Sequence, residues 1–167
     1  DDVHVAEAVD LGLSVMWASF NVGAESPEDY GGYYAWGETE EKSAYSWSTY
    51  KWCNGGYDNL FKYCARNNYG TIDNKTKLDF EDDVAHVKWG GSWRMPTFDE
   101  IKELCYKCSW EWTTVNGVKG QKITGSNGNS IFLPAAGVFR DTEVYGSGIG
   151  YWSSTLGTQD NSTASCV

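Results

Sequence analysis

The chain has 167 residues, with 13 basic against 23 acidic side chains and a net charge of −10. That length fits one domain, and an acidic chain without a Lys/Arg cluster is a poor partner for nucleic acid or an anionic membrane surface. No apolar run approaches the roughly 18 residues of a membrane helix, so we predict no membrane insertion, and the 9 Trp, 11 Tyr and 6 Phe predict an aromatic core.

The N-terminal part predicts short elements joined by loops. Residues 9–22 are apolar and β-prone around a glycine, which favours a strand interrupted by a turn or bulge. Residues 26–32 combine an N-cap serine, a proline at the first helical position and a terminating Gly-Gly pair, so we predict a helix of one or two turns. The aromatic run at 32–37 is expected to be a strand, and residues 38–59 are expected to be mainly loop.

Residues 73–83 form an acidic run with two interpretations. One is a one-turn helix capped by Asp79, with Asp82 at the capping-box position. The other is a calcium site, because carboxylate oxygens such as those of Asp73, Asp79, Asp82 and Asp83 are the ligands that calcium prefers, although their spacing is not the EF-hand pattern. We therefore expect no cofactor, with calcium as the alternative.

A helix is predicted at 97–108. Thr97 followed by Glu100 makes a capping box directly after a proline. An apolar stripe along this helix is expected to face the core and consists of Phe98, Ile101, Leu104, Cys105 and Cys108.

The C-terminal part predicts a β-meander. Residues 110–115 alternate, an Asn-Gly pair gives the strongest short hairpin signal, and residues 118–124 and 130–133 continue the sheet. A last short strand is expected at 150–154. One or two helices with several short strands and long loops predict the α+β class.

The cysteines leave several alternatives open. Five cysteines occur, so at least one thiol lies outside any intramolecular disulfide framework. Cys53 and Cys64 are able to pair in an oxidising compartment. Cys105 and Cys108 are spaced as a redox pair or half of a zinc site, but two buried apolar groups on a helical stripe are the simpler interpretation.

Four segments together resemble one family. They are residues 9–39 and 73–104, NGNSIFLPAAG at 127–137 and GYWSS at 150–154. They are similar to the C-type-lectin-fold domains of gut Bacteroidetes, in the branch of the formylglycine-generating enzymes, the Fibrobacter major paralogous domain and the retroelement-diversified variable proteins. The box Arg94-Met95-Pro96-Thr97 with Glu100 is similar to the start of a helix in that branch.

The resemblance implies a single C-type-lectin-like domain over residues 1–167, without the family's closing C-terminal strands. It also implies a non-catalytic module that binds a protein or glycan ligand, outside or on the surface of a Gram-negative cell, with anchoring as a lipoprotein left open. The residues nearest the family's variable segment are Tyr151, Trp152, Asp160 and Asn161, which become candidate ligand-binding residues.

Two tryptophans on the first strand of the meander are further candidates for ligand binding. Trp110 and Trp112 lie two residues apart and share one strand face, which suits a stacking surface and a core equally well. For Trp152 too, a place in the core is the simpler interpretation.

Two other functions remain as alternatives. The formylglycine-generating enzymes use paired cysteines near the C-terminus with copper, whereas that part of this chain offers only Cys166. A structural or assembly domain of a surface protein or a phage receptor-binding protein is the second alternative.

Overall fold

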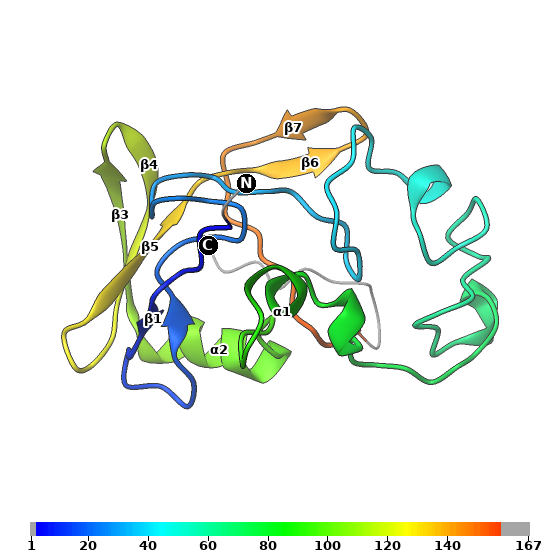
Figure 1. Ribbon diagram of the computed structural model, residues 1–167, viewed down its shortest axis with the longest axis horizontal. Coiled ribbons are helices and arrows are strands. Elements are labelled where there is room, and N and C mark those ends of the chain that lie inside the picture. The colour runs from blue at the N-terminus through cyan, green and yellow to red at the C-terminus, as the bar shows by residue number, and fades with distance from the viewer. Residues whose placement is uncertain (1–2, 158–167) are drawn as a thin grey trace.

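The computed structural model describes residues 3–157 as a small mixed α/β protein (Figure 1). Its helices are few and short, and its strands form separate antiparallel sheets. In chain order the strands and α-helices are β1 (Ala8–Val9), β2 (Trp17–Ala18), α1 (Val84–Trp89), α2 (Phe98–Lys107), β3 (Ser109–Val115), β4 (Val118–Thr124), β5 (Ser130–Pro134), β6 (Val138–Arg140) and β7 (Glu143–Tyr145). Three 3-10 turns lie before α1, namely η1 (Trp47–Thr49), η2 (Asn67–Tyr69) and η3 (Phe80–Asp82).

The largest sheet has the order β3-β4-β5, as the meander prediction requires. Its first turn consists of Asn116 and Gly117, whose φ angles of 47° and 81° are both left-handed. This is the backbone of a type I′ turn, which matches the twist of the two strands it joins. The hairpin signal in the sequence was therefore correct.

The predicted capping box begins α2. Thr97 Oγ1 accepts the backbone N–H of Glu100, and the Glu100 carboxylate accepts the N–H of Thr97 at 2.8 Å. Arg94 adds a two-pronged ion pair to the same carboxylate, at 2.7 and 2.8 Å. Ile101 and Leu104 then face the core as predicted, and the helix ends at Lys107.

Two hydrophobic clusters form most of the core. The first joins Leu104 of α2 to the sheet through Leu11, Ile123 and Ile131. The second surrounds Tyr63 and collects large rings, namely Tyr34, Trp36, Trp52, Trp89 and Trp152. The expectation of an aromatic core is thus confirmed for the second cluster, whereas the buried residues of the first are aliphatic.

The rings of the second cluster also hold irregular backbone in place. Trp36 Nε1–H donates to the carbonyl of Ser153 at 2.7 Å, and Trp52 Nε1–H donates to that of Gly37 at 2.7 Å. Such bonds satisfy buried indole N–H groups while they replace the strand pairing that these loops lack.

Two elements predicted in the N-terminal part are wrong. Residues 26–32 form a turn, because the Asp29 carboxylate accepts the N–H of Glu25 and the Asp29 N–H donates to Ser26. Residues 32–37 form no strand, since the indole bonds of the second cluster hold this segment instead. The apolar segment 9–22 contributes to the β1-β2 hairpin, which fits the interrupted strand that was expected.

Three further differences appear later in the chain. Residues 150–154 do not form the predicted strand. Instead the Ser154 N–H donates to the Pro96 carbonyl, and the Ser154 carbonyl accepts the N–H of Leu78. The helix α1 and the hairpin β6-β7 were not predicted. Asp79 stands before η3 as expected, but its side chain makes no cap hydrogen bond.

Candidate functional site

Residues 44–72 form a segment that we call the aromatic lobe. Figure 1 shows it at the far end of the long axis from the sheet β3-β4-β5. Eight of its residues are aromatic, from Tyr45 to Tyr69, although it contains no strand longer than a single bridge. A surface feature built from rings and loops at one end of a protein is the strongest candidate for a site.

The backbone of the lobe is held by bridges around its own small core. Leu60 pairs with Cys53 on one side and with Gly70 on the other. Gly70 has a φ of 142°, and a Cβ at this position would meet the Leu60 carbonyl oxygen at 2.2 Å, so only glycine fits. Leu60 is buried together with Cys53 and Cys64.

Three rings of the lobe are directed to solvent. Trp47 is 42% exposed, Tyr57 56% and Phe61 48%. The Trp47 and Tyr57 rings lie 6.4 Å apart, edge to face. Phe61 lies 6.1 Å from Trp52 in the same relation. Because each exposed ring packs against another ring of the lobe, it has little side-chain entropy left to lose on binding.

Lys62 anchors the lobe to the rest of the molecule. Its Nζ lies 2.7 Å from Asp82 Oδ2 and 3.1 Å from Asp79 Oδ2, and 4.5 Å from the centre of the Trp52 ring. Burial opposes the charge, but the hydrogen bonds to Asp82 and Asp79 outweigh it and raise the pKa of Lys62. The lysine therefore stays charged as an internal counter-ion.

Tyr63 strengthens the same connection. Its hydroxyl donates to Asp82 Oδ2 at 2.5 Å and accepts the N–H of Asp79 at 3.0 Å. Burial, and then the hydrogen bond to Asp82, raise the pKa of Tyr63, so the phenol stays protonated and remains a donor.

The four aspartates proposed as calcium ligands each have protein partners. Asp79 and Asp82 bind Lys62, while Asp73 accepts the N–H groups of Tyr63 and Cys64 at 2.9 Å. Asp83 is buried and accepts N–H groups from two residues, His86 at the start of α1 and Met95. Within residues 3–157 no group of three or more His, Cys, Asp or Glu side chains is arranged to hold a metal ion.

The predicted ligand-binding residues near the end of the chain are directed inward where the structure describes them. Tyr151 donates its hydroxyl to Asn21 Oδ1 at 2.7 Å, and burial raises its pKa. Trp152 Nε1–H donates to the Tyr34 carbonyl at 2.9 Å, and the ring packs on the second core cluster. These contacts favour the core interpretation. Asp160 and Asn161 lie outside the described residues.

The two tryptophans of β3 have different environments. Trp110 packs on the first core cluster, and its Nε1–H donates to the Leu104 carbonyl at 3.0 Å. Trp112 is 43% exposed, and the Lys119 ammonium lies 4.9 Å from its ring centre. The structure therefore does not combine them into one stacking surface.

The cysteines correct two expectations. Cys53 and Cys64 are buried free thiols, so the Cys53–Cys64 disulfide is absent. Cys105 is disulfide-bonded, so Cys105 and Cys108 are neither a free redox pair nor two buried thiols. Burial raises the pKa of the Cys108 thiol, which disfavours the reactive thiolate.

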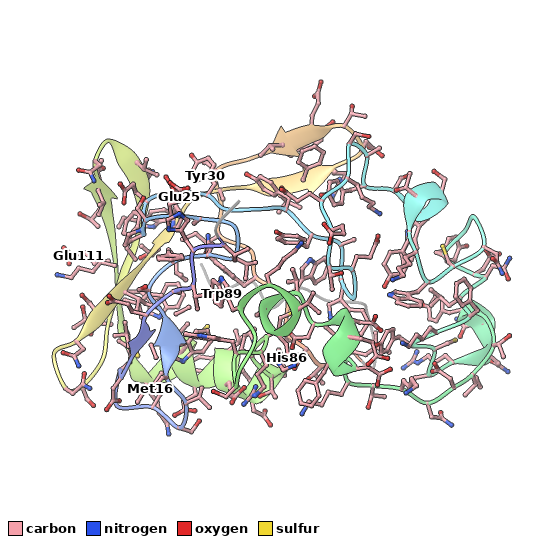
Figure 2. All side chains as sticks on the ribbon, in the orientation of Figure 1. Met16, Glu25, Tyr30, His86, Trp89 and Glu111 are labelled. Carbon is pink, nitrogen blue, oxygen red and sulfur yellow. The ribbon has the colours of Figure 1, made fainter. Side chains whose placement is uncertain are left out.

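A second surface feature lies away from the lobe. An open depression is lined by Gly23, Glu28, Asp29, Tyr30, Gly31 and Val118. Figure 2 shows Tyr30 near Glu25, far from the lobe end of the molecule. The Glu28 carboxylate there accepts the Asn116 amide at 2.9 Å, which leaves it partly committed to the fold.

Comparison of the chain with protein-family models, with curated proteins and with solved structures finds no match. No helix within residues 3–157 has the length and apolar character needed to cross a membrane. Function must therefore be argued from the described surface.

The sequence analysis missed the rings that the structure exposes in the lobe, Trp47, Tyr57 and Phe61. Their segment was expected to be mainly loop, and its ring content was assigned to the core. A usable signal was present, because residues 44–72 contain eight rings but only one acidic residue, Asp58, in an otherwise acidic chain. A loop with this composition is typical of a recognition surface.

Proposed function

We propose that this protein is a non-catalytic ligand-binding module and that the aromatic lobe is its recognition surface. The observation that carries the proposal is the set of exposed rings on a lobe with its own core, in which Trp47 contacts Tyr57 and Phe61 contacts Trp52. Rigid rings among small polar residues supply contact area at low entropic cost, as in other protein and glycan recognition surfaces.

We also propose that the frame is C-type-lectin-like. The motif resemblance is the main support, together with a mixed α/β frame that carries long irregular loops. The disulfide at Cys105 supports a location outside the cytoplasm, because such bonds persist in oxidising compartments.

The test is a binding screen with ring variants. The chain is applied to a glycan array and to candidate surface proteins, and its ligands are then measured with Trp47→Ala and Tyr57→Ala. We expect binding to weaken about tenfold or more per ring, taking as a guide the roughly 1–3 kcal/mol that stacking of a nucleic-acid base on one aromatic ring contributes.

The matched control is Tyr106→Ala, which removes a ring that is 84% exposed on α2, away from the lobe. This variant should bind as the parent chain does. Equal loss in all three variants, or no loss in the lobe variants, would show that the lobe is not the recognition surface.

A further inference from the structure

The aromatic lobe differs in charge from the rest of the molecule. It contains Lys51, Lys62 and Arg66 against Asp58 alone, a net charge of +2, while the whole chain carries −10. The charge of Lys62 is neutralised internally by Asp79 and Asp82. The cations that the lobe offers to solvent are therefore Lys51 and Arg66.

Neither of these two cations has a counter-ion among the residues that the structure describes. Both side chains are exposed, and no carboxylate within residues 3–157 forms an ion pair with either of them. Each therefore remains able to pair with an anionic group of a ligand.

The cations lie on the same small framework as the exposed rings. Lys51 Nζ is 4.6 Å from the centre of the Trp52 ring, and the same ring contacts the exposed Phe61. The Phe61 N–H donates to the Trp52 carbonyl at 3.0 Å, so the backbones of the two residues lie side by side. Arg66 lies directly before η2. Tyr69 ends η2, and its carbonyl accepts the N–H of Leu60 at 2.8 Å.

We infer that the lobe binds an acidic polysaccharide, an inference that rests on the proposed function and names its ligand class. The apolar C–H face of a sugar ring stacks on an aromatic ring, and a carboxylate or sulfate on the sugar pairs with Lys51 or Arg66. Charge-assisted bonds of this kind are the stronger class of hydrogen bond.

The distribution of polar groups favours a glycan over a protein partner. Exposed amides lie between rings of the lobe, namely those of Asn54, Asn67 and Asn68, while the Asn59 amide donates to the Asn54 carbonyl at 3.1 Å. Amides suit the many hydroxyls of a sugar. A nucleic acid is disfavoured because its binding depends on many Lys/Arg contacts to phosphate, whereas the lobe offers two cations to solvent, Lys51 and Arg66.

The experiment compares polymers that differ in charge alone. Affinity electrophoresis and calorimetry of the full chain are run with polygalacturonate against its methyl-esterified form, and with dextran sulfate against dextran. We expect binding to at least one of the anionic polymers, with about tenfold weaker binding to its neutral counterpart, since one charge-assisted bond contributes about 1.5–3 kcal/mol. Added NaCl should weaken the anionic complex.

Two double variants connect the effect to the lobe. The variant Lys51→Gln with Arg66→Gln should weaken binding to the anionic polymer about tenfold, since charge-assisted bonds are lost. The control, Lys107→Gln with Lys122→Gln, removes two exposed lysines outside the lobe and should leave this binding unchanged. Thermal melting confirms that each variant is folded.

The outcomes separate the two proposals. If the charged and neutral polymers bind equally well and Trp47→Ala abolishes both complexes, the inference of an acidic ligand is overturned. The proposal that the rings form the binding surface would then still stand. Binding to neither anionic polymer, or tighter binding to a single-stranded oligonucleotide with the same variant dependence, would also overturn it. The proposed function falls only when the lobe ring variants leave every measured ligand unaffected.

Discussion

Lys62 and Asp82 form an ion pair, with 2.7 Å between Nζ and Oδ2, that joins the aromatic lobe to the turn before α1. Asp82 is buried, and Tyr63 donates to the same oxygen. The pair is therefore one of the contacts that hold the aromatic lobe against the core.

Replacing Asp82 should destabilise the protein. Asp82→Asn removes the counter-ion of Lys62 and leaves one amide oxygen in place of the carboxylate that accepts from both Lys62 and Tyr63, so we expect a loss of about 2–3 kcal/mol in the free energy of unfolding. Urea denaturation measures it. Asp79→Asn is the control, because that carboxylate is more exposed and a pair of that kind contributes about 1 kcal/mol or less. Equal losses in the two variants would contradict a dominant role for Asp82.

The cap of α2 makes a separate prediction. Thr97→Ala removes the side-chain acceptor for the Glu100 N–H and should cost about 1 kcal/mol. Thr97→Ser keeps the oxygen and should stay close to the parent chain. The melting temperatures of the three proteins decide the matter, and an unchanged value for Thr97→Ala would show that the cap contributes nothing.

Glu100 predicts an acid-dependent loss of stability. The hydrogen bond from Arg94 outweighs burial and lowers the pKa of Glu100 from 4.5 to about 2. A carboxyl with a lowered folded-state pKa stabilises the fold above its unfolded pKa, and that stability is lost as the pH falls from 4.5 toward about 2. Glu100→Gln should make the free energy of unfolding depend less on pH in this window. Parallel pH profiles of the two proteins would refute the assignment.

Calcium should have little effect on the folded chain. Lys62 and backbone N–H groups already occupy the carboxylates of the acidic run, including Asp73 and Asp83. We expect the melting temperature and ligand binding to be the same in EDTA and in millimolar calcium. A clear rise in melting temperature with calcium would instead support the metal site that the sequence suggests.

Where local chemistry is sufficient, sequence reasoning predicted the structure. The Thr97–Glu100 box and the Asn116-Gly117 turn each complete their bonds within a few residues, so composition and spacing predict them. Sequence reasoning failed at residues 26–32, where a local turn competes with the predicted helix. It also failed at residues 32–37, where hydrogen bonds with distant partners hold the backbone.

The candidate site shows the same division. The number of rings in residues 44–72 can be read from the chain, and so can the excess of basic over acidic side chains there. Which rings face water cannot be read in this way, because Trp52 and Tyr63 pack toward Lys62 while Trp47 and Tyr57 do not. An aromatic side chain has the same local preferences in a core and on a surface, and long-range packing alone distinguishes the two.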